Sequence, residues 1–209
     1  MVKSDELPSR LERIAGVDVA YARGLSIGAA VVLESPSLEV VSEAYVVVPT
    51  LFPYIPTLLS FREVYPALLA VKRLGERFDI LFVDGNGVLH PFRAGFASHL
   101  GVVLDVPAIG IAKKLLCGRI GEWRGRWAPI LDGGEVIGAA VRTSERGRAI
   151  YVSIGHKVSL ETAVRLTLWA TRGGSKLPEP IRAAHSLASR IARDLRSRPP
   201  ERAGRSPRS

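Results

Sequence analysis

The segment from residue 80 to residue 111 limits the possible folds more than any other part of the sequence. Residues 80–83 are a short apolar run followed by two glycines, as in a buried strand, and residues 106–111 are a further apolar run. Between them, residues 94–104 carry apolar side chains at helical spacing. A strand, a helix and a strand in this order form a parallel crossover unit, so the pattern predicts an α/β protein.

Three strands are predicted ahead of this unit, over residues 13–21, 27–33 and 38–48, and their short turns make them an antiparallel meander. A helix with Ser60 as its N-cap and Phe61 towards the core should end near Gly75. After residues 117–134, which resemble an insertion, we expect a hairpin over 135–141 and 149–153, then helices over 160–171 and 180–195. The predicted fold is therefore one mixed sheet with helices on both faces.

The charge and cysteine content narrow the class of protein. Lys and Arg total 29 against 20 acids, a net charge of +9 that is typical of nucleic-acid binders. The single cysteine excludes an internal disulfide framework and a Cys-based zinc site. No apolar run reaches the roughly 18 residues of a membrane span, and the first residues do not resemble a secretory signal. We expect a cytoplasmic monomer.

The domain organisation follows from length and composition. Residues 1–195 are long enough for a single domain with a sizeable core. Residues 196–209 contain five arginines, one glutamate and three prolines, so this basic tail is expected to be disordered.

Three carboxylates have placements that suggest a shared site. Asp18 lies in the first predicted strand, Glu63 in the following helix and Asp84 at the end of the central strand. The first and fourth strands should be neighbours, which would bring Asp18 and Asp84 together. A purely structural role remains open for two of them, because Asp84-Gly85 is a common turn dipeptide and Glu63 could complete a capping box with Ser60.

Converging acids repel one another, and a bound cation makes such an arrangement favourable. Carboxylate oxygens select Mg²⁺, for which Mn²⁺ can substitute. A metal-carboxylate cluster on a basic protein points to the hydrolysis of phosphodiesters.

Several longer motifs resemble those of the endonuclease V family, deoxyinosine-directed repair nucleases with a ribonuclease H-like fold. The match spans about residues 10–195, and its motifs are Ile14-Ala15-Gly16-Val17-Asp18, Pro53-Tyr54-Ile55-Pro56, Leu59-Ser60-Phe61-Arg62-Glu63, Asp84-Gly85-x-Gly87-x-x-His90-Pro91, Gly95-x-Ala97-Ser98-His99-x-Gly101-Val102, Pro107-x-Ile109-Gly110-x-Ala112-Lys113 and Pro178-Glu179-Pro180-x-Arg182-x-Ala184-His185.

The resemblance implies a role for each matching residue. The metal ligands would be Asp18, Glu63 and Asp84, and His185 and Lys113 would complete the catalytic group. The loop Pro53, Tyr54, Ile55 and Pro56 would separate the strands as a wedge. The pocket for the flipped base would involve Leu59, Gly85, Gly87, His99 and Leu116, and the substrate or phosphate contacts would be His90, Arg93 and Lys114.

Alternatives stay open for several of these side chains. Tyr54 could plug its loop against the core, and each of the four histidines, 90, 99, 156 and 185, could be structural. The chain also departs from the family pattern near the pocket. Thr57 stands where the family usually has glycine, and Phe92-Arg93 replaces the usual arginine after His90-Pro91, so base selectivity is affected more than catalysis.

The implied reaction is hydrolysis of the second phosphodiester bond 3′ to deoxyinosine in DNA, leaving 3′-hydroxyl and 5′-phosphate ends. The same fold could instead act on inosine in RNA, because local contacts read the 2′-hydroxyl. A lesion-binding protein with structural acids is the alternative from another class.

Overall fold

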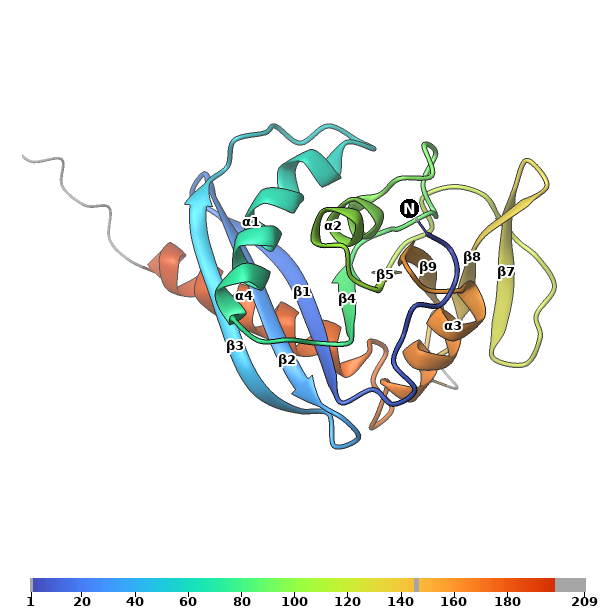
Figure 1. The fold of residues 1–209 in the computed structure, drawn as a ribbon. Helices are drawn as coiled ribbons and strands as arrows, with labels where there is room; N and C mark the ends of the chain where they lie inside the picture. Colours follow the sequence, from blue (N-terminus) through green and yellow to red (C-terminus); the bar gives the residue numbers. More distant parts are fainter. Residues whose placement is uncertain (1, 145–146, 198–209) are drawn as a thin grey trace, which may run out of the picture.

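The computed structural model describes residues 2–144 and 147–197. In these ranges nine strands form one sheet in the order β3-β2-β1-β4-β5-β9-β8-β7-β6 (Figure 1). The strands are β1 Arg13–Ala22, β2 Leu25–Glu34, β3 Glu39–Pro49, β4 Ile80–Asp84, β5 Ala108–Ala112, β6 Arg119–Ile120, β7 Trp127–Asp132, β8 Glu135–Val141 and β9 Ile150–His156.

The pairing confirms the predicted mixed sheet. Strands β1, β2 and β3 are an antiparallel meander, and β4 joins β1 in parallel. Strand β5 is parallel to β4, as a crossover unit requires, and β9 then pairs antiparallel to β5. Residues 117–134 are part of the sheet and not an insertion, because β6 and β7 extend it beyond β8.

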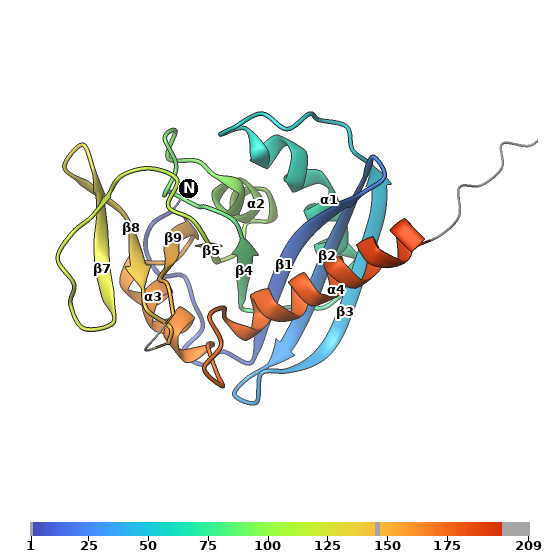
Figure 2. The same cartoon turned by 180° about the vertical axis from the view of Figure 1, so that it is seen from behind.

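Helices cover both faces of the sheet (Figures 1 and 2). Helices α1, Leu59–Leu74, and α2, Phe96–Leu104, pack on one face, where Val17, Val19 and Val83 point. Helices α3, Leu160–Trp169, and α4, Glu179–Ser197, pack on the other face, against Ile14 and Phe82. Among the described helices, none combines the length and apolar character needed to span a bilayer.

Helix α1 is rotated relative to the prediction. It begins at Leu59 after an N-cap at Leu58 that has no side-chain hydrogen bond, so Ser60 does not cap it. Ser60 and Glu63 lie on its buried face, while Phe61 is 58% exposed. The small side chains of Ala67 and Ala70 let this face approach the sheet, and a phenylalanine there would not fit. The capping-box interpretation of Glu63 is therefore wrong.

Other predicted helix ends agree with the structure. Gly75 ends α1 in the left-handed conformation, and the Ser159 hydroxyl accepts a hydrogen bond from the Thr162 amide at the start of α3. Helix α4 continues two residues past the predicted boundary, to Ser197. The tail predicted to be disordered comprises residues 196–209; its first two residues belong to α4, so the prediction is wrong for them, and residues 198–209 lie outside the described residues.

Two glycines set the distance between the sheet and the helices that carry the candidate site. A methyl group on Gly16 in β1 would overlap the carbonyl of Pro180 at the start of α4. A methyl group on Gly28 in β2 would overlap the carbonyl of Pro66 in α1. Neither glycine has a positive φ, so the close approach of the backbones explains both.

We expect Gly16→Ala to destabilise the protein by about 2–3 kcal/mol, because α4 must move away from β1. Gly133→Ala is the matched control, since Gly133 lies in an open turn at a φ of 58° with no atom near the added methyl. The control should lose only about 1 kcal/mol of stability, because alanine in the left-handed conformation adds backbone strain. Urea midpoints measure both, and a Gly16→Ala loss no larger than the control's would contradict this account of the packing.

Candidate active site

The register of two parallel strands brings two of the predicted acids together. Val17 of β1 pairs with Val83 of β4, so the next residues, Asp18 and Asp84, lie side by side on the face that α4 covers. Helix α4 adds His185, and one ligand atom from each of these three residues lies within 4.8 Å of the others. The group is at the rim of the sheet, where α/β proteins bind ligands.

Asp18 is held rigidly in this group. Its side chain is buried, and its Oδ1 accepts a hydrogen bond from the Val19 amide at 2.8 Å. Its Oδ2 lies 2.7 Å from His185 Nδ1. Burial raises the pKa of Asp18, and the negative charge of Asp84 raises it further, while His185 opposes the shift. The interpretation of His185 as a core histidine is wrong, because the residue is exposed.

Asp84 forms an ion pair with a lysine side chain. Lys113, which follows β5 directly, places Nζ 2.6 Å from Asp84 Oδ2 and is exposed to solvent. Asp84 therefore ends a buried strand in an ion pair and not only in a turn. The two carboxylates fit Mg²⁺ or Mn²⁺, which prefer oxygen ligands, and the repulsion that raises the pKa of Asp18 is what a cation would relieve.

Glu63 reaches the same rim from the opposite face of the sheet. It is 7% exposed, and its Oε1 accepts a hydrogen bond from the Tyr21 hydroxyl at 3.2 Å. Burial raises the pKa of Glu63 to about 8, with contributions from the charges of Asp18 and Asp84. Glu63 is near enough for this influence but is not one of the three residues grouped within 4.8 Å.

Tyr21 is a site residue that the sequence reasoning missed. Burial and the neighbouring Glu63 raise its pKa, so its hydroxyl stays a hydrogen-bond donor. The guanidinium of Arg62 lies 4.2 Å from the centre of its ring. Alternation along β1 could have found it, because Tyr21 points to the same face as Val17 and Val19, towards α1.

The predicted wedge is an exposed loop between β3 and α1. Pro53, Tyr54, Ile55 and Pro56 are all exposed, and Tyr54 is 67% exposed. Tyr54 therefore does not plug the loop against the core. The loop's two prolines fix φ on either side of Tyr54-Ile55, and the loop is attached to the rest of the protein at Thr57.

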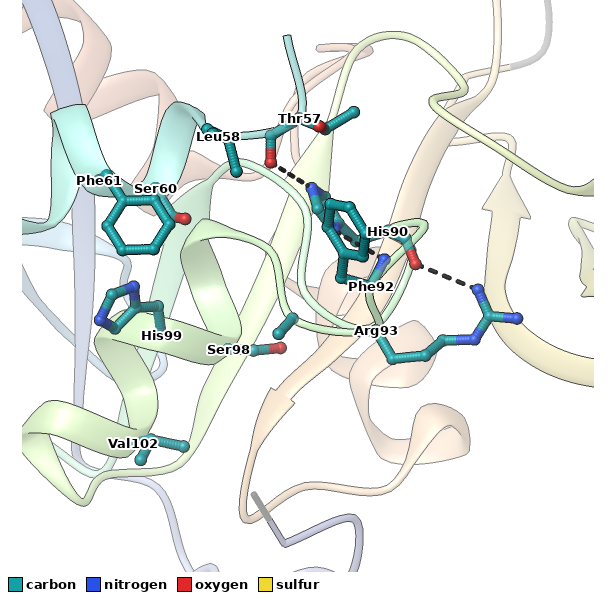
Figure 3. Close-up of a pocket in the computed structure, with 11 residues that line it drawn as sticks. Thr57, Leu58, Ser60, Phe61, His90, Phe92, Arg93, Ser98, His99 and Val102 are labelled. Atoms are coloured by element: carbon teal, nitrogen blue, oxygen red, sulfur yellow. Dashed lines mark hydrogen bonds between the residues drawn. The ribbon is translucent and has the colours of Figure 1, made fainter. Parts of the chain in front are cut away.

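His90 provides that attachment. The Phe92 amide donates to His90 Nδ1 at 3.2 Å, so Nδ1 is unprotonated and Nε2 donates to the Thr57 carbonyl at 2.9 Å (Figure 3). Burial lowers the pKa of His90, which favours this neutral form. Thr57 has a φ of 68°, in the left-handed region that favours glycine, which gives a physical reason for a glycine at this position.

A cavity of about 430 Å³ lies beside this attachment, between the start of α1 and α2. Figure 3 shows Phe61 and His99 on one side of it and His90 and Phe92 on the other. The rings of Phe61 and His99 meet edge to face, with centroids 5.8 Å apart. The lining residues are Thr57, Leu58, Ser60, Phe61, His90, Phe92, Arg93, Ala94, Ser98, His99 and Val102.

Of the predicted base-pocket residues, only His99 lines this cavity, together with the predicted contacts His90 and Arg93. Leu59, Gly85, Gly87 and Leu116 do not line it. The Gly85 amide donates to the Ile111 carbonyl and the Gly87 amide to the Ser153 hydroxyl, both at 2.9 Å. These amides have acceptors within the protein, and both glycines also lie in close contact with neighbouring chain segments.

The other predicted contacts separate into two kinds. Arg93 forms ion pairs with Asp132 and Glu135, both at 3.0 Å, which use its guanidinium within the protein. Lys114 is exposed. The buried His156 accepts a hydrogen bond from the Val2 amide at Nδ1 and bonds to Asp105 through Nε2, so its role is structural.

We expect Glu63→Gln to change how the stability of the metal-free protein depends on pH. A raised pKa in the folded state means that stability is highest below the unfolded value of about 4.5 and is lost as pH rises towards about 8. The wild type should lose on the order of a few kcal/mol over this range, and the variant less. Urea unfolding at pH 5 and pH 8 with a chelator measures this, with the exposed-site variant Glu161→Gln as control. Equal losses in wild type and Glu63→Gln would contradict the prediction.

Comparison with known proteins assigns the chain to a family. A family model described as Endonuclease V matches residues 1–186. Endonuclease V from Thermofilum pendens is 53% identical over 193 residues, which cover 92% of this chain and 83% of the relative. The structure of Endonuclease V from Streptomyces avermitilis has a TM-score of 0.85 at 40% identity, with 93% of this chain and 87% of that chain covered.

A further similar structure contains nucleic acid. It is Endonuclease V from Ciona intestinalis in complex with a 24mer DNA containing an inosine followed by a ribo-adenosine. It has a TM-score of 0.81 at 29% identity and covers 93% of this chain and 92% of that chain. The ribonuclease H-like fold expected from the motifs is thereby confirmed. The chain belongs to the endonuclease V family.

Proposed function

We propose that this nuclease is a metal-dependent endonuclease that recognises deoxyinosine in DNA. It hydrolyses the second phosphodiester bond 3′ to the lesion and leaves 3′-hydroxyl and 5′-phosphate ends. The observation that carries the proposal is the group of Asp18, Asp84 and His185 within 4.8 Å at the rim of the sheet, with Lys113 on Asp84. Membership of the endonuclease V family and the inosine-containing DNA of the Ciona intestinalis structure support it.

Asp18, Asp84 and Glu63 would hold Mg²⁺ or Mn²⁺, which would supply an activated water and neutralise charge on the phosphate. His185 donates a hydrogen bond to Asp18 and so fixes the orientation of that carboxylate. The exposed ammonium of Lys113 can turn from Asp84 towards the phosphate and stabilise the negative charge that develops there. Tyr21 holds Glu63 in place from the other face of the sheet.

The loop and the cavity divide the recognition of the lesion between them. The exposed Tyr54 enters the strand as a wedge, and the flipped base enters the cavity between Phe61, His99 and His90. A mispaired base costs least to unstack, which favours deaminated adenine. Leu59, Gly85, Gly87 and Leu116 remain proposed contacts on the resemblance alone, as does Lys114 for a phosphate.

We expect Asp84→Asn to lower the cleavage rate of a deoxyinosine duplex in Mg²⁺ by roughly 10³-fold, about 4 kcal/mol, because it removes one charge from the metal site. Single-turnover cleavage of labelled duplexes measures this, with Glu161→Gln as the control that removes an exposed acid in α3. Undamaged duplexes should stay intact. Cleavage by Asp84→Asn at the wild-type rate would contradict the assignment of Asp84 to the metal site, and a wild type that binds the deoxyinosine duplex without cutting it would favour a lesion-binding protein whose acids are structural.

Cleavage of inosine-containing RNA is the second candidate function. The inosine is followed by a ribonucleotide in the Ciona intestinalis complex, which favours testing a 2′-hydroxyl at the neighbouring position. We expect a higher kcat/KM for a deoxyinosine strand than for the matched inosine RNA strand. Measuring both, with a DNA strand that carries one ribonucleotide 3′ to the lesion, decides the matter. A higher value for the RNA would make the protein a ribonuclease.

A further inference from the structure

The exposed face of α4 carries a polar stripe that begins at the metal-site histidine. His185, Ser189 and Arg193 are four residues apart, so they lie in line along the helix. The opposite face, which includes Ile181, is buried against the sheet. His185 and Arg193 are exposed and Ser189 between them is half-buried, so the stripe is accessible at both ends and continuous with the site of Asp18 and Asp84.

The far end of the stripe is basic. Other arginines of α4 have partners, since Arg182 pairs with Glu179 and Arg190 with Glu43. Arg193 is exposed and has no ion pair with an acid of the described residues.

Two more arginines lie beside this end of α4. Arg196 donates to the carbonyl of Tyr21, at the end of β1, and Arg23 donates to the carbonyl of Arg196. Both bonds use main-chain oxygens, so the positive charges of Arg23 and Arg196 are not neutralised there.

The arrangement of the two faces of the sheet indicates which flank of a bound strand would run along the stripe of α4. Helices α1 and α2 lie on one face of the sheet and α4 lies on the opposite face (Figure 2). The cavity is lined by residues of α1 and α2, and Asp18 and Asp84 lie at the rim of the sheet beside α4. In the proposed reaction the lesion is on the 5′ side of the bond that is cut. A strand with its lesion in the cavity and that bond at Asp18 and Asp84 therefore leaves the site on the side of α4 as its 3′ flank.

We propose that the stripe of His185, Ser189 and Arg193, with Arg23 and Arg196 at its end, binds the phosphodiester backbone of the 3′ flank. This inference rests on the proposed function. From His185 to Arg193 the helix rises about 12 Å, which equals the axial length of three or four nucleotides in one strand of a duplex, at about 3.4 Å each along the duplex axis. Arginine and serine side chains are common phosphate contacts, and they set the position of a strand without reading its sequence.

The test compares deoxyinosine strands that share one 5′ flank and extend 2 or 10 nucleotides beyond the cut. For the wild type, the longer 3′ flank should lower KM roughly five- to tenfold, as a few charge-assisted contacts would. Arg193→Ala should lose most of this advantage, mainly in KM and not in kcat. In a plot of log KM against log salt concentration, the slope for Arg193→Ala should be smaller than the wild-type slope by about 0.7–0.9, the value for one lost phosphate contact. Arg190→Ala removes an arginine of the same helix that already pairs with Glu43, and it should behave as the wild type.

The outcomes separate the two proposals. If the wild type cuts the deoxyinosine strands and Arg193→Ala keeps the full dependence on the 3′ flank, the stripe does not bind the 3′ flank and the proposed function stands. An equal loss of affinity for both flank lengths in Arg193→Ala also contradicts binding of the 3′ flank by the stripe. If the wild type cuts neither strand, the proposed function is wrong and the role of the stripe is wrong with it.

Discussion

The parallel pairing of β1 with β4 is the constraint on which the rest of the site depends. It fixes two carboxylates side by side at the end of two buried strands, where their charges repel and burial adds to the cost. Two other elements supply groups that partly offset this cost: His185 of α4 hydrogen-bonds to Asp18, and Lys113 after β5 hydrogen-bonds to Asp84. The two neighbouring carboxylates still favour the binding of a cation.

Strand alternation then divides the site between the two faces of the sheet. Asp18 and Asp84 point towards α4, while Tyr21 points towards α1 and meets Glu63 there. The two helices can deliver their side chains to one rim because Gly16 and Gly28 let them approach the sheet closely. The geometry of the candidate site therefore depends on two glycines that lie within the sheet.

The parts of the structure that follow from local periodicity could be predicted from the sequence, and the parts set by packing could not. The strands, the crossover and the pairing of Asp18 with Asp84 follow from apolar runs and turn lengths. The rotation of α1 could not be predicted, because it depends on how closely β2 lets the helix approach. Likewise, the Ser153 hydroxyl accepts a hydrogen bond from the Gly87 amide, 66 residues away in the sequence, and no local sequence pattern predicts this contact.

Thr57 is where local preference and tertiary structure disagree most. Its left-handed backbone costs roughly 1–2 kcal/mol for a residue other than glycine, and a β-branched side chain suits it poorly. The conformation persists because His90 binds the Thr57 carbonyl and Pro56 restricts the chain before it. The second hydrogen bond of His90, which its Nδ1 accepts from the Phe92 amide, needs the neutral form of the ring, and burial favours that form. His90 therefore positions the proposed wedge, residues 53–56, and the mouth of the cavity from outside the loop, against the backbone preference of Thr57, which joins them.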